Sequence, residues 1–196
     1  MRGFFYFRSM NARFDNAIQK FDDYNASDPN GKELLYSQRM SDRLELFRPG
    51  SAEHIKLAIR CQHIGRWTIP RNTFPEGKKG YMAWRNQLKS FHAETAGSIL
   101  KDCSYDAETI HKVQDLLLKK DLRSNPETQL LEDVVCMVFV EFYLDEFAGK
   151  HDDEKVIDIL AKTLKKMSAE AIDVATHFRL DPRTQELLLR AAAAGR

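Results

Sequence analysis

The segment from Pro126 to Phe142 limits the possible folds of this chain more than any other feature, because apolar residues cover most faces of the helix that it would form. These apolar residues are Leu130, Leu131, Val134, Val135, Val138, Phe139 and Phe142. Proline is favourable at a first helical position, and a helix that is apolar all round has to be buried. Its longest apolar run, 134–140, is far shorter than the roughly 20 residues of a membrane span. The pattern predicts the central helix of a globular protein.

The rest of the chain also repeats apolar residues at helical spacing and shows no convincing strand alternation. We expect residues 13–196 to form one all-α domain, a single helical bundle of about eight to nine helices. Residues 1–12 are expected to be an N-terminal extension, for which disorder is the alternative to an ordered segment. One helix should end near His63 and the next should begin near Tyr81. The helix starts carry residues that favour capping: Ser51, Asp106, Asp152, Ser168 and Asp181.

Composition excludes several classes of protein. Apolar residues make up 43% and charged residues 30% of the chain, and the formal net charge of +1 gives no whole-chain reason to expect nucleic acid or a membrane. The three cysteines, Cys61, Cys103 and Cys136, are widely spaced and include no C-x-x-C pair. Neither a disulfide framework nor a zinc knuckle is therefore predicted, and the reducing cytoplasm is the expected compartment.

Positive charge is concentrated around one expected loop. Lys56 to Lys89 contains eight basic residues and only Glu76 as an acid, and 64–80 is a loop without periodicity that contains Trp67 and Phe74. Long loops of this kind are usually functional or disordered. Two interpretations of the charge remain open: solvated helix faces, or a site for a phosphate-bearing ligand.

Two histidines and one acidic pair are the candidate site residues. His63 lies at the expected end of a helix, and the spacing of His92 with apolar residues predicts that it faces inward. Glu132 or Asp133 must face inward on the central helix, where a carboxylate needs a partner such as Arg60 or a metal ion. Imidazole serves as an acid, a base or a metal ligand, but each histidine could equally have a structural role.

Three motifs resemble the HD-domain phosphohydrolases: L-A-I-R-C-Q-H-I-G, F-H-A-E-T-A-G-S-I-L and L-E-D-V-V. Members of that family have a helical core that supplies a histidine, a His-Asp doublet, a further histidine and an aspartate. The resemblance implies an HD-like bundle with Gln62 and His63 at the catalytic doublet. It further implies a divalent metal ion held by His63, His92 and Asp133. Tyr36 stands where the family has its first histidine.

The same resemblance implies a phosphate-bearing substrate. The basic residues expected to bind its phosphate are Arg66, Lys78, Lys79 and Arg85.

Most of the chain also resembles a family catalogued only as a domain of unknown function. The resemblance begins at Phe14 and includes the motifs D-P-N, E-L-L-Y-S-Q-R-M, R-C-Q-H-I-G-R-W and D-D-E-K-V-I-D-I-L. Some of its members are labelled glutamyl-tRNA-synthetase-like. H-I-G-R and K-K-M-S are similar to parts of the two synthetase signatures, which bind ATP only on a parallel sheet. This sequence predicts no strands, so we do not expect synthetase activity.

Three functions remain open from the sequence. The first is a divergent metal-dependent phosphohydrolase acting on a phosphate-bearing small molecule or nucleotide. The second is a non-catalytic binder of a nucleotide or RNA, with Trp67, Tyr81 and Trp84 as stacking surfaces. The third is a helical interaction protein with a degenerate site. We rank the hydrolase first and expect no membrane partner.

Overall fold

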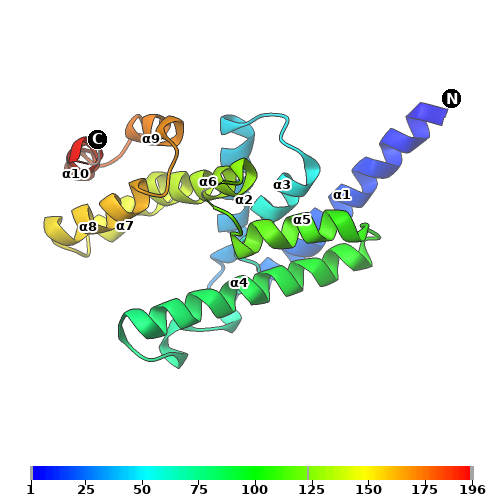
Figure 1. Cartoon of the computed structure of the whole chain (residues 1–196), viewed down its shortest axis with the longest axis horizontal. Helices are drawn as coiled ribbons and strands as arrows, with labels where there is room; N and C mark the ends of the chain where they lie inside the picture. The colour runs from blue at the N-terminus through cyan, green and yellow to red at the C-terminus, as the bar shows by residue number, and fades with distance from the viewer. Residues whose placement is uncertain (1, 123, 195–196) are drawn as a thin grey trace. The chain divides into compact units, whose positions relative to one another are not determined.

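The computed structural model describes residues 2–122 and 124–194 (Figure 1). These residues form helices and connecting turns with no strand, which confirms the all-α prediction. The chain divides into two compact units, Met1–Asp121 and Leu122–Arg196, which we call unit 1 and unit 2. Across the described part of the chain, no helix has the length and apolar character needed to cross a membrane. The assignment of 1–12 to an extension and of 13–196 to one domain stays a prediction.

Unit 1 is built from five α-helices and the loop that contains two short 3-10 turns. The helices are α1 (Arg2–Ala26), α2 (Glu33–Phe47), α3 (Glu53–Arg60), α4 (Gly77–Asp102) and α5 (Ala107–Leu118), and the turns are η1 (Arg66–Thr68) and η2 (Arg71–Thr73). Helix α3 packs against α1, α2 and α5, and α4 runs alongside α5 (Figure 1). Leu57 and Ile59 of α3 are fully buried, so this short helix lies in the core of the unit.

Local capping chemistry explains where several helices start. Asp106 accepts the backbone N–H of Thr109 at the start of α5, as predicted. Ser51 does not cap α3: its hydroxyl donates to the Arg48 carbonyl at 2.7 Å, and the N-cap residue of α3 is Ala52. The prediction for Ser51 was wrong because the chain turns tightly after α2, which brings Ser51 back to the last carbonyl groups of that helix.

The loop before α4 is shorter than predicted because α4 begins at Gly77 and not near Tyr81. Gly80 is the reason that the chain can turn so closely. A Cβ atom at this position would overlap the backbone carbonyl group of Pro75. The absence of a side chain therefore allows the loop to lie directly against the first turn of α4.

Unit 2 contains α6 (Pro126–Phe142), α7 (Leu144–Ala148), α8 (Asp153–Leu164), α9 (Ala169–Thr176) and α10 (Pro182–Ala194). Helix α6 has buried residues on most of its faces, as predicted. Asp152 and Ser168 cap α8 and α9 by accepting the N–H groups of Lys155 and Ala171, which confirms both starts. The sequence did not predict α7, because a helix of five residues is too short to show periodicity.

Candidate functional site

The turn that follows α3 brings the first candidate residues together. Gly65 has a φ of +66°, and its N–H donates to the buried side-chain oxygen of Asn25 at 3.3 Å. The carbonyl of Ile64 accepts from His92 Nδ1 at 2.7 Å. A left-handed backbone favours glycine, and these two contacts tie the turn to α1 and α4. The turn thereby fixes the positions of His63 and Arg66 on either side of it.

His63 is surrounded by both charged and aromatic groups. Its ring stacks on Tyr36 of α2, with centroids 4.2 Å apart and planes 16° from parallel, and lies 6.0 Å from the ring of His92. His63 Nε2 lies 3.3 Å from Arg66 Nη1, and His63 Nδ1 lies 3.8 Å from a carboxylate oxygen of Glu33. Because a guanidinium only donates, Nε2 accepts and Nδ1 carries the proton of a neutral ring. Burial, and then Arg66, hold the pKa of His63 well below its usual value.

His92 presents an unpartnered nitrogen in the interior. A carbonyl oxygen can only accept, so Nδ1 carries the proton that is donated to Ile64. His92 Nε2 is therefore an acceptor, and no hydrogen-bond donor reaches it among the described residues. The residue is only 4% exposed, and burial lowers its pKa to about 4, with Arg66 and Arg85 adding to the effect.

Glu33 and Gln62 complete the polar cluster. Tyr36 donates its hydroxyl to Gln62 Oε1 at 3.1 Å, so Gln62 is held beside the stacked pair. Burial raises the pKa of Glu33 to about 7, although the positive charge of Arg66 opposes that rise. Glu33 was not among the predicted site residues. It precedes Tyr36 by three residues on α2, and this helical spacing was the signal that could have found it.

A pocket of about 320 Å³ opens beside this cluster. Its lining residues come from the turn before α2, the first residue of α2, the loop before α4, and α4 itself: Asp28, Asn30, Lys32, Glu33, Arg66, Trp67, Ile69, Pro70, Arg71 and Trp84. The Arg66 guanidinium lies 4.7 Å from the centre of the Trp84 ring. The Asp28 carboxylate accepts the backbone N–H groups of Asn30, Lys32 and Glu33, so its role is to fix the turn.

The four residues predicted to bind phosphate divide into two groups. Arg66 lines the pocket. Burial lowers the pKa of Arg66, and the positive charge of Arg85 lowers it further. Arg85 makes no hydrogen bond or ion pair with any side chain that the structure describes. Lys78 and Lys79 are exposed in the first turn of α4 and do not line this pocket.

The acidic pair of α6 belongs to unit 2 and has partners there. Asp133 Oδ1 accepts from Gln129 Nε2 at 2.9 Å and from the backbone N–H of Ser168 at 2.7 Å. Glu132 lies 3.8 Å from the Lys166 ammonium. An inward orientation was predicted for one of the two carboxylates, and both are buried.

Arg60 was one suggested partner for these carboxylates. It is instead bound to both carboxylate oxygens of Asp22, at 2.7 and 2.6 Å.

These contacts bear on the predicted metal centre. The structure brings His63 and His92 together in unit 1, and the prediction that Asp133 joins them stays a prediction. Within 2–122 and 124–194, no three or more His, Cys, Asp and Glu side chains are arranged to hold a metal ion. His63 Nε2 is also engaged by Arg66. The divalent metal ion that the HD resemblance implies stays a prediction.

A protein-family model described as Domain of unknown function (DUF4202) matches residues 15–188. The chain belongs to this family. No curated protein and no solved structure matches this DUF4202 chain. The match confirms the predicted resemblance to a family of unknown function, and the HD-like and synthetase-like resemblances stay predictions. All the residues of the unit 1 cluster and pocket, 28–92, lie inside the DUF4202 match.

Proposed function

We propose that unit 1 binds a phosphate-bearing small molecule, with a nucleotide as the preferred class, in the pocket beside Arg66. One observation carries this proposal: Arg66 lines the pocket, its pKa is lowered first by burial and then by the positive charge of Arg85, and Glu33 is the nearby acid that opposes this. Two guanidinium groups in a partly desolvated cluster repel each other. An anion that contacts both would remove that repulsion.

The acids around the pocket do not cancel this positive charge. Glu33 has its pKa raised to about 7, so near neutral pH a large fraction of it is protonated. Burial alone would raise the pKa of Asp28, but backbone N–H groups lower it, so this carboxylate stays charged and offsets only one of the cations. Lys32 and Arg71 add two more cations to the lining. Guanidinium groups match the geometry of phosphate oxygens, so phosphate is the anion that this set would bind best.

The aromatic lining supports a ligand with a ring. Trp67 and Trp84 both line the pocket, and a base or sugar ring gains stacking energy against such faces. The volume of about 320 Å³ lies at the lower end of the roughly 300–1,000 Å³ of small-molecule sites. A mononucleotide or a sugar phosphate therefore suits the pocket better than a nucleic-acid strand.

Loss of Arg66 should weaken binding of adenosine monophosphate strongly. A charge-assisted hydrogen bond contributes about 1.5–3 kcal/mol, so we expect Arg66→Gln to bind roughly 10- to 100-fold more weakly in isothermal titration calorimetry. Arg179→Gln, at an exposed position in unit 2, is the matched control and should bind like the wild type. Circular dichroism establishes that both variants are folded. The proposal fails if the wild type binds neither adenosine monophosphate nor inorganic phosphate, or if Arg66→Gln binds them equally well.

Metal-dependent hydrolysis of the bound ligand is the second candidate, and His92 favours it. Metal-bound histidines usually donate one ring N–H to a carbonyl or carboxylate and keep the other nitrogen for the metal, and His92 has this arrangement. We expect a divalent ion bound by the untagged protein to be lost in His92→Asn. If no metal is retained under saturating manganese, zinc and iron, the hydrolase is rejected. The binding proposal is not affected by that result, because the Arg66→Gln titration tests it.

A further inference from the structure

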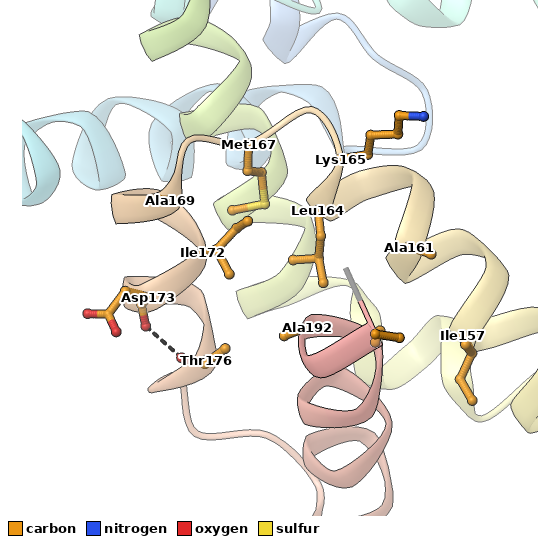
Figure 2. Close-up of a pocket in the computed structure, with 12 residues that line it drawn as sticks. Ile157, Ala161, Leu164, Lys165, Met167, Ala169, Ile172, Asp173, Thr176 and Ala192 are labelled. Carbon is orange, nitrogen blue, oxygen red and sulfur yellow. Dashed lines mark hydrogen bonds between the residues drawn. The ribbon is translucent and has the colours of Figure 1, made fainter. Parts of the chain in front are cut away.

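Unit 2 contains a second and larger cavity of about 770 Å³ between α8, α9 and α10. Figure 2 shows Leu164, Met167 and Ile172 gathered in the middle of this space. All its lining residues belong to unit 2, so the cavity is independent of the phosphate pocket of unit 1. Its volume lies well within the roughly 300–1,000 Å³ of small-molecule sites.

Small side chains leave this space open. Alanines from all three helices face it: Ala161, Ala169, Ala191, Ala192 and Ala194. Protein interiors are normally packed without voids larger than a water molecule, because empty space loses dispersion contacts. The lining is apolar apart from Lys165, Asp173 and Thr176. An apolar chain or ring would therefore gain contacts here that the protein itself does not make.

The charges stand at the edge of the cavity. In Figure 2 the Lys165 amine and the Asp173 carboxylate both point away from Leu164 and Ile172. Lys165 belongs to a basic run at the end of α8 in which Lys162 pairs with Asp158 and Lys166 lies near Glu132. Among the described residues, Lys165 has no such acidic partner. Its flexible side chain can reach over the rim to an anionic group.

We propose that this cavity binds a free amphiphile with a linear apolar chain and a carboxylate head, of the fatty-acid class. The chain lies between Leu164, Met167, Ile172 and Ala192, and the carboxylate pairs with Lys165. Ala169, the first residue of α9, lines the cavity near the turn that carries Lys165, so the positive end of that helix supports the same orientation. The Asp173 carboxylate points away on the opposite side of the cavity in Figure 2, so the anionic head group is placed beside Lys165.

The probe is dodecanoate, titrated into the full chain below its micelle concentration by isothermal titration calorimetry. We expect one site per chain, with binding about fourfold tighter for each added methylene from octanoate to dodecanoate, the equivalent of roughly 0.8 kcal/mol per buried CH₂. Dodecyltrimethylammonium, which has the opposite head charge, should bind more weakly. Absence of binding, or equal binding of both head groups, overturns the proposal.

Two kinds of variant locate the site. Ala192→Leu and Ala161→Leu fill the cavity from different helices and should each weaken dodecanoate binding more than tenfold, with helicity unchanged. Lys165→Gln should weaken dodecanoate binding about twofold to fivefold and leave dodecan-1-ol unaffected, as expected for an exposed ion pair. Lys155→Gln, elsewhere on α8, is the control. Unchanged dodecanoate binding in both alanine variants shows that the cavity is not the site. If the chain instead forms a dimer that Ala161→Glu dissociates, a second copy of the chain covers the cavity and the fatty-acid proposal is wrong.

Discussion

Replacement of Gly65 by alanine is expected to lower the free energy of unfolding by about 3 kcal/mol. Part of this loss is the cost of roughly 1–2 kcal/mol for a side chain in the left-handed region, since Gly65 has a φ of +66°. The remainder comes from packing, because a Cβ atom would lie 2.8 Å from ring carbons of both Phe91 and Tyr24. Forcing rings apart in a packed region costs about 1–3 kcal/mol. Urea denaturation measures the loss.

Gly31 provides a matched control for this substitution. Its φ is +64°, nearly the same as that of Gly65, but a Cβ atom there would meet nothing within 4 Å. Gly31→Ala should therefore lose only the backbone part, about 1–2 kcal/mol. The difference between the two variants isolates the contact of the turn with Phe91 and Tyr24. Equal losses in the two variants would show that the turn is not packed as described.

The second large effect is a pH dependence of stability caused by His92. Its pKa is about 4 in the folded state, against an ordinary value of 6.5. The unfolded chain therefore binds more protons between these values, and stability falls as the pH drops from about 6.5 towards 4. Between pH 7 and pH 5 this amounts to about 2 kcal/mol. His63 acts in the same direction, because its pKa is also lowered.

Glu33 has the opposite effect on stability. Its pKa is raised from 4.5 to about 7, so the folded state binds more protons in this interval, and stability falls as the pH rises through it. Its side chain is only 14% exposed, so solvent screening is limited, and the change between pH 5 and pH 7 is again about 2 kcal/mol. The two residues therefore partly cancel in the wild type.

Two variants separate these opposing contributions. His92→Asn keeps a donor for the Ile64 carbonyl but does not titrate. The stability difference, defined as the free energy of unfolding at pH 7 minus that at pH 5, should therefore decrease by about 2 kcal/mol in this variant. Glu33→Gln should increase the same difference by about 2 kcal/mol. Urea denaturation at the two pH values tests both. If neither variant changes the difference, the cluster is hydrated and the pKa shifts are absent.

Features that depend on a few neighbouring residues were predictable from the sequence. The caps at Asp106, Asp152 and Ser168 follow from local hydrogen bonding, and the burial of α6 follows from its composition. The start of α4 was not predictable, because K-K-G-Y offers no apolar periodicity and its position depends on the contact of Gly80 with Pro75.

The site was predictable only in part. The spacing of apolar residues indicated that His92 faces inward, and it does. The approach of Glu33 and Tyr36 to His63 depends on how α2 packs against the turn after α3, which no local pattern encodes. The positions of Lys78 and Lys79 outside the pocket likewise follow from the close turn before α4, although their charge and proximity in sequence suggested otherwise.

The stacking of Tyr36 on His63 also gives this protein an intrinsic spectroscopic reporter. With the two ring centres 4.2 Å apart, the carbon-bound protons of the imidazole lie in the shielding cone of the phenol. Their nuclear magnetic resonance signals should appear upfield of those of an exposed histidine, and a Tyr36→Leu variant should return them to ordinary positions. A molecule that enters beside Arg66 and moves either ring would then be detected without any label.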